Sequence, residues 1–352
     1  MQVARILAVR LDNLGDVIML SPALRSLRRA YPTARLTLMV SPAGRAAAAL
    51  IPEMDEVFVH RALWQDVRAQ MPFAPAREEA LIEAIRKRAF DAAFVFTSFS
   101  QSPYPAAYVC YLAGVPVRVA QSREFGGGVL TTWVAPLPDD AHQVDRNLHL
   151  LAGCGIAIDG SRRMAIAVPG LAREHADALL RYEGVGSDFI ALAPGATCSA
   201  RRYSLERFRD VALALRRLGH RVVVLGGEAD REAGEALAAP PGIVSLCGRT
   251  DLAMLAAIVA RARLLVSNDS GPMHIADAVG CPVVVLYAGT DRESQWRPRS
   301  VPARLLRRPT PCAPCYRFTC PYDHECLAIA PAEVVVAVQG LLADSPREAA
   351  RA

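Results

Sequence analysis

The segment Ser267–His274 combines the residue types that hold an anion at the start of a helix. It lies between two short apolar runs, which predict a buried strand on either side. Asp269 and Ser270 are favoured N-cap residues, and Gly271 permits a close approach of the backbone. N–H groups at a helix start after a strand typically bind phosphate, and His274 adds a donor in the first turn. The alternative is an ordinary capped helix.

A second polar turn, Arg10–Val17, follows the apolar run near the N-terminus. Gly15 allows a close backbone turn, and Asp16 begins the helix that follows. A carboxylate in this place can act as a general base. The alternative is a first-turn aspartate that complements the helix dipole, an interaction worth about 0.3–1 kcal/mol. The turn lacks the pattern G-x-G-x-x-G, which argues against a dinucleotide-dependent dehydrogenase.

The loop Pro194–Ser204 resembles a cradle for a polyphosphate. Its small residues and hydroxyls, Thr197 among them, precede the adjacent cations Arg201 and Arg202. Guanidinium groups pair with phosphates through two parallel hydrogen bonds, so these residue types suit a diphosphate. The alternative is a solvated loop before a helix that Ser204 caps.

Two further turns at predicted strand ends complete this set. In Leu225–Asp230, paired glycines let a ligand pack against the backbone, and Glu228 can accept hydrogen bonds from a ribose or a base. A tight turn with a capping acid explains the same residues. The turn Gly248–Leu252 follows the next strand and is expected to border a base pocket.

The elements that position these turns alternate between strand and helix, which predicts parallel sheets in doubly wound domains. The predicted strands are 3–9, 36–40, 92–96, 115–119, 164–170, 189–195, 221–225, 243–246, 263–266 and 282–287. The predicted helices are 16–30, 77–88, 106–112, 142–154, 171–182, 205–218, one ending at 238, 252–262 and 331–342. Such domains bind ligands at the carboxyl ends of their strands, so two of them are expected to face one central cleft.

Composition supports a globular protein with two domains. The chain has 352 residues, of which 52% are hydrophobic and 21% charged, enough to bury a large core. The net charge of +5 is modest and does not indicate a nucleic-acid partner. The sequence shows no signal peptide and no run of about 18 apolar residues, so a cytoplasmic location is expected.

The motifs Leu14–Val17, Pro194–Tyr203 and Asn268–His274 resemble those of glycosyltransferase family 9 in order and spacing. These are the ADP-heptose:lipopolysaccharide heptosyltransferases, and the resemblance runs from about Val3 to Leu342. The cysteine-rich segment 312–326 is similar to one in family members close to heptosyltransferase II. The family resemblance implies a GT-B fold and inverting transfer of heptose from ADP-heptose to the lipopolysaccharide inner core.

The resemblance also implies three parts. Residues 1–170 are expected to form an acceptor-binding Rossmann-like domain, and residues 171–330 a nucleotide-sugar-binding Rossmann-like domain. Residues 331–352 are expected to form a helix that returns toward the first domain, followed by a tail.

The resemblance also implies roles for individual residues. Asp16 matches the family's general base. The residues implied to bind the donor are Thr197, Arg201, Arg202, Glu228, Asp269, Ser270, Gly271 and His274. Arg10, Asn13 and Gly15 are expected to meet the acceptor. The family's lysine falls on Arg201, which keeps the charge but lacks a compact ammonium.

The implied partners are ADP-heptose and a lipid-linked anionic glycan of the Kdo-lipid A type, met by peripheral contact with the inner membrane. Three alternatives stay open: transfer from another nucleotide-sugar, a nucleotide-sugar epimerase with the same fold, and a binding protein without turnover. The sequence has no Asp-x-Asp, so no metal and no other cofactor is expected for catalysis.

A cluster of cysteines near the C-terminus follows the pattern C-x2-C-x4-C-x5-C. Its members are Cys312, Cys315, Cys320 and Cys326. Four such thiols are candidate zinc ligands, although the spacing is compressed and has a single C-x-x-C. The alternatives are four thiols without metal, or a disulfide. The other five cysteines are scattered, and core packing is their expected role.

Overall fold

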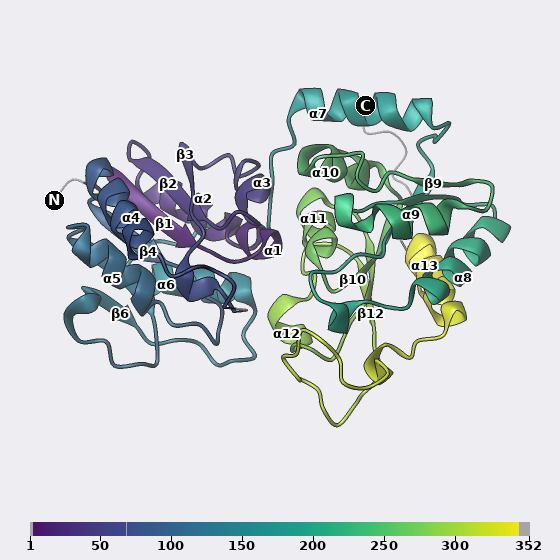
Figure 1. The fold of residues 1–352 in the computed structure, drawn as a ribbon. Coiled ribbons are helices and arrows are strands. Elements are labelled where there is room, and N and C mark those ends of the chain that lie inside the picture. Colours follow the sequence, from purple (N-terminus) through teal and green to yellow (C-terminus); the bar gives the residue numbers. More distant parts are fainter. Residues whose placement is uncertain (1–2, 68, 345–352) are drawn as a thin grey trace. The chain divides into compact units, whose positions relative to one another are not determined.

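Two parallel sheets of six strands each organise the computed structural model, which describes residues 3–67 and 69–344 (Figure 1). The chain divides into two units, Met1–Ala167 and Val168–Ala352. The predicted domain boundary, between 170 and 171, lies in the first turn of the helix that opens the second unit. Within the described residues, no helix combines the length and the apolar character needed to cross a membrane.

The first unit has the strand order β3-β2-β1-β4-β5-β6. Its strands are β1 (Arg5–Arg10), β2 (Arg35–Val40), β3 (Glu56–Val59), β4 (Ala92–Val95), β5 (Val117–Gln121) and β6 (Thr132–Val134). Its helices are α1 (Leu14–Ile18), α2 (Ser21–Ala30), α3 (Arg45–Ala48), α4 (Pro75–Arg88), α5 (Tyr104–Leu112) and α6 (Gln143–Gly153), with short 3-10 turns η1 (Leu63–Gln65) and η2 (Gly127–Val129). Strand β1 pairs in parallel with β2 and β4, so the strand order reverses at β1.

The second unit has the strand order β12-β11-β10-β7-β8-β9. Its strands are β7 (Phe189–Ala193), β8 (Arg221–Val224), β9 (Ile243–Ser245), β10 (Leu264–Asn268), β11 (Val283–Leu286) and β12 (Ala303–Leu306). Its helices are α7 (Gly170–Tyr182), α8 (Leu205–Arg217), α9 (Arg231–Ala238), α10 (Leu252–Arg261), α11 (Gly271–Val279), α12 (Glu293–Trp296) and α13 (Pro331–Asp344), with 3-10 turns η3 (Ser199–Arg201), η4 (Glu228–Asp230) and η5 (Glu325–Leu327). Here the order reverses between β7 and β10, which are paired neighbours.

The two sheets confirm the predicted α/β class, with three corrections. The predicted helix 16–30 is two helices, because the ring of Pro22 cannot follow a continuous helix past the carbonyl of Ile18. No strand forms over the described segment 164–170. Its backbone instead bonds Ser21 Oγ (3.1 Å, from Ala165) and the Leu50 carbonyl (2.8 Å, from Ala167). The strands β3, β6 and β12, all at sheet edges, were not predicted.

The last helix belongs to the core of the second unit. Figure 1 shows α13, in yellow, beside α8, and the two helices contact each other. Its apolar side chains Val334, Val338 and Leu341 are buried in the same cluster as Phe208 of α8. The return of this helix toward the first domain stays a prediction, and the tail over 345–352 lies outside the described residues.

Candidate active site

The first polar cluster lies at the carboxyl end of β1, where the strand order of its sheet reverses. Its centre is Arg10, whose side chain is 0% exposed. The Arg10 Nε lies 2.9 Å from Asp12 Oδ2, and its Nη2 donates to Asp16 Oδ1 at 2.8 Å and to Ser98 Oγ at 2.9 Å. Such reversal points are the usual ligand sites of doubly wound sheets.

Arg10 was expected to meet the acceptor, and this stays a prediction. Its guanidinium is buried and lies against three side chains of its own unit. Two of these side chains are the carboxylates of Asp12 and Asp16. Sequence reasoning missed Asp12 and Ser98, although the charge pattern Arg-x-Asp at a strand end is a signal for the first of them.

Asp16 keeps a partly accessible carboxylate within this cluster. Its side chain is 14% exposed, and its Oδ2 accepts the Asn13 backbone N–H at 3.2 Å. Asn13, exposed at the N-cap of α1, and Gly15, buried in its first turn, therefore shape the backbone around Asp16. The Asp16 carboxylate caps the start of α1. Each of its oxygens still has a lone pair that can accept a further hydrogen bond.

Asp12 is the more deeply buried carboxylate. Burial raises its pKa, and Asp16 adds to that rise, while Arg10 and a hydrogen bond from Gln101 oppose it. The amide Nε2 of Gln101 donates to Asp12 Oδ1. The cluster therefore holds two carboxylates around one cation.

The second cluster lies where the order reverses in the other sheet, between the ends of β7 and β10. Arg201 Nε donates to Thr290 Oγ1 at 3.0 Å and lies 3.9 Å from Asp269 Oδ2, while its Nη2 forms an ion pair with Asp291. Burial alone would lower the pKa of Arg201, but Asp269 and Asp291 outweigh burial and raise it. Arg201 is therefore a fixed cation. Sequence reasoning missed its partners Thr290 and Asp291.

Asn268 joins the two predicted phosphate-binding segments. This side chain is fully buried at the end of β10. Its Nδ2 donates to the Pro194 carbonyl at 2.7 Å, and its Oδ1 accepts the Tyr203 N–H at 3.1 Å. The loop that carries Arg201 is thus tied to the start of α11.

The start of α11 keeps the predicted residues together. Ser270 is the N-cap and Gly271 the first helical residue, while His274 is buried in the first turns of the helix. The Ser270 hydroxyl lies 3.4 Å from the Asn268 carbonyl and thus bonds away from the N–H groups of α11.

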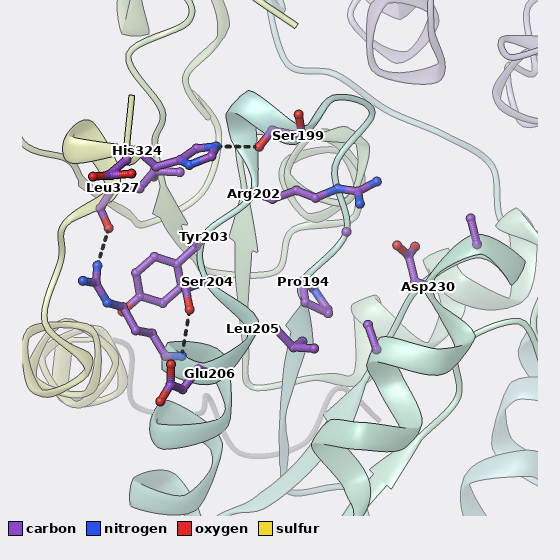
Figure 2. Close-up of a pocket in the computed structure, with 15 residues that line it drawn as sticks. Pro194, Ser199, Arg202, Tyr203, Ser204, Leu205, Glu206, Asp230, His324 and Leu327 are labelled. Atoms are coloured by element: carbon purple, nitrogen blue, oxygen red, sulfur yellow. Dashed lines mark hydrogen bonds between the residues drawn. The ribbon is translucent and has the colours of Figure 1, made fainter. Parts of the chain in front are cut away.

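Three predicted donor residues lie apart from the Arg201 cluster. Arg202 donates to the Ala196 carbonyl (3.2 and 3.0 Å) and lines a separate cavity of about 580 Å³. Figure 2 shows His324 on one side of Arg202 and Asp230 on the other. The predicted Glu228 is 73% exposed, with Arg231 hydrogen-bonded to it and lowering its pKa, and Thr197 is exposed.

The cysteine-rich segment 312–326 braces the Arg201 cluster. Its backbone bonds both sides of that cluster, through Cys315 N to the Gly289 carbonyl (2.9 Å), Tyr316 N to the Thr290 carbonyl (2.8 Å) and Ala200 N to the Phe318 carbonyl (3.1 Å). All four cysteines line a cavity of about 20 Å³ and are free thiols. Across residues 3–67 and 69–344, no three His, Cys, Asp or Glu side chains are arranged to hold a metal ion.

The family model for glycosyltransferase family 9 (heptosyltransferase) matches residues 79–325. The chain belongs to glycosyltransferase family 9. It is therefore an enzyme that transfers a glycosyl group, as the resemblance predicted. Lipopolysaccharide heptosyltransferase 2 of Escherichia coli K12 is 26% identical over 321 residues, which cover 86% of this chain and 88% of that protein.

Solved structures of other family 9 proteins share the fold of this enzyme. The structure of E. coli ADP-heptose lps heptosyltransferase II has a TM-score of 0.77 at 24% identity, covering 97% of this chain and 100% of its own. The glycosyltransferase family 9 protein of Veillonella parvula has a TM-score of 0.79 at 22% identity, covering 98% and 99%. These likenesses confirm the predicted GT-B class with two Rossmann-like domains.

Proposed function

We propose that this family 9 glycosyltransferase transfers a heptose from ADP-heptose to a hydroxyl of the lipopolysaccharide inner core, inverting the anomeric centre. The observation that carries the proposal is that each sheet has a polar cluster at its reversal point, one with a carboxylate and one with a fixed cation. The relatives' names supply the sugar and the acceptor class.

The second unit suits the donor diphosphate. We place the diphosphate at the start of α11, because a helix N-terminus favours an anion, and Arg201 lies 3.9 Å from Asp269 beside that helix start. Ser270, Gly271 and His274 complete this proposed site. We expect three further residues to contact the donor at the end remote from its diphosphate, or to reach it only after their side chains rearrange. These residues are Arg202, Glu228 and Thr197.

The first unit suits the acceptor, and Asp16 is the proposed base. Its carboxylate takes the proton of the acceptor hydroxyl, and the oxygen forms a bond to the anomeric carbon. The bond from that carbon to the diphosphate breaks, and ADP leaves with the electron pair. Attack on the face opposite the leaving group inverts the centre. Arg201 and the helix start stabilise the leaving charge, so the step needs no metal or other cofactor.

Domain roles and location follow from this assignment. We assign acceptor binding to 1–170 and nucleotide-sugar binding to 171–330, with Asn13 and Gly15 next to the acceptor hydroxyl. We place the enzyme in the cytoplasm, in peripheral contact with the inner membrane, because the proposed acceptor is lipid-linked.

The test is turnover of Asp16→Asn with ADP-heptose and a Kdo-lipid A acceptor. Loss of a general base lowers kcat by about 100-fold or more, and the KM for ADP-heptose should stay within about three-fold of the wild type. Glu83→Gln, which removes a charge from the exposed face of α4, is the matched control and should leave both constants unchanged.

Three results would overturn parts of the proposal. Near-normal turnover of Asp16→Asn refutes the base. Consumption of ADP-heptose without any acceptor indicates an epimerase or hydrolase. Faster turnover with another nucleotide-sugar moves the donor assignment to that sugar.

A further inference from the structure

The cluster at the end of β1 contains a carboxylate that the proposed reaction does not use. Asp12 is 9% exposed and binds Arg10 through Nε, while Asp16 binds the same guanidinium through Nη2. The two carboxylates therefore share one guanidinium. The contact between Arg10 and Asp16 is made through Nη2, which also donates to Ser98.

The charges around this cluster come from three elements. Arg10 ends β1, Asp12 and Asp16 lie in the turn and in α1, and Arg146 comes from α6. Burial lowers the pKa of Arg146, and Arg10 adds to that effect, so the two guanidinium groups sense each other. Ser98 and Gln101, from the loop after β4, are neutral.

We propose that Asp12 is a positioning residue that shares Arg10 with Asp16 and so keeps Asp16 oriented and sufficiently basic to accept a proton. The proposal rests on the assignment of Asp16 as the base. A carboxylate in a bidentate pair with arginine is strongly stabilised in its ionised form and is a poorer proton acceptor. Asp12 counters this stabilisation by pairing with Nε of Arg10 and so opposing the charge of the guanidinium.

Removal of the Asp12 charge should therefore shift the pH profile of kcat in a defined direction. In Asp12→Asn the positive charge of Arg10 acts on Asp16 without opposition, which favours ionised Asp16. The acid limb of the kcat profile, which rises as the base loses its proton, should move to lower pH by about one unit. Because a weaker base transfers the proton less readily, kcat on the alkaline plateau should fall by about 3- to 10-fold.

The experiment measures kcat and both KM values of the full-length enzyme between about pH 5.5 and 8.5. We expect the KM for ADP-heptose to stay unchanged, because the donor is assigned to the other unit. A purely structural role for Asp12 would lower kcat without moving the acid limb. Glu83→Gln removes one negative charge from an exposed helix and should leave the limb in place.

A second variant covers the case in which Asp12→Asn does not fold. Gln101→Met removes the donor to Asp12 Oδ1 and so weakens ionised Asp12. It should move the acid limb in the same direction by a smaller amount.

The inference is wrong if Asp16→Asn is inactive while the acid limb in Asp12→Asn or in Gln101→Met stays at its wild-type pH. The proposed function fails separately, through near-normal turnover of Asp16→Asn. An inactive Asp12→Asn with active Asp16→Asn would make Asp12 itself the base, and this also overturns the inference.

Discussion

Replacement of Asn268 by alanine tests whether the two proposed phosphate-binding segments depend on one buried amide. The side chain is fully buried and connects the Pro194 carbonyl (2.7 Å) with the Tyr203 N–H (3.1 Å). Alanine removes both partners at once. The main-chain groups lie inside the loop that presents Arg201, so they lose their bonds while still shielded from water.

The magnitude follows from these two bonds. A buried donor or acceptor left without a partner costs about 1–3 kcal/mol, so the pair should lower the free energy of unfolding of the second unit by about 2–6 kcal/mol. Release of the loop also frees Arg201 from its fixed place. The affinity for ADP should therefore fall by about ten-fold or more, which corresponds to about 1.4 kcal/mol.

The assay combines urea unfolding with calorimetric titration of ADP. Asn147→Ala is the matched control: this asparagine of the first unit is also fully buried and also forms two hydrogen bonds, to the Met19 carbonyl (3.1 Å) and from Gln143 (2.9 Å). It should cost a similar free energy of unfolding and leave ADP affinity unchanged. A loss of less than about 1 kcal/mol in Asn268→Ala, or equal ADP affinities in the two variants, would refute the reasoning.

The remaining predictions concern the second unit and the buried thiols. Arg201→Met should weaken ADP binding by about ten-fold or more in calorimetry, because it removes the cation of the donor cluster; unchanged affinity would exclude that role. At about pH 8, iodoacetamide should modify exposed Cys312 but spare Cys110, whose pKa burial raises to about 12, until urea is added; peptide mass mapping distinguishes the two. Gly195→Ala should cost about 1–3 kcal/mol in urea unfolding, since its Cβ would lie 2.6 Å from the Asp230 carboxylate, and an unchanged midpoint would contradict this contact.

In the candidate site, the predictions that depended on local sequence agree with the structure. Strand ends, N-caps and glycine turns depend on residues close in sequence, so Ser270 and Gly271 occupy the predicted start of α11 and Asp16 the predicted first turn of a helix. The proline at position 22, also local, was overlooked, and the helix 16–30 was therefore predicted as continuous. The edge strands β3, β6 and β12 are too short to show a clear alternation of apolar and polar residues.

The contacts of long polar side chains were harder to predict, because their hydrogen-bond partners lie far away in the sequence. Arg10 reaches Ser98, which is 88 positions away, and Arg201 reaches Thr290, which is 89 positions away. Arg201 and Arg202 are neighbours in sequence with the same charge, and they still point to different surroundings.

The sequence by itself determined the alternation of strands and helices, the family and the turns able to hold an anion or a base. Those properties depend on periodicity and on capping within a few residues. Only the tertiary structure decided that Arg10 is buried between Asp12 and Asp16, and that Asn268 ties the Arg201 loop to β10. Arg10 also donates to Ser98 from the loop after β4, and Asn268 joins the end of β10 to the loop after the neighbouring strand β7. A buried charge or amide is stable only where the fold supplies such partners.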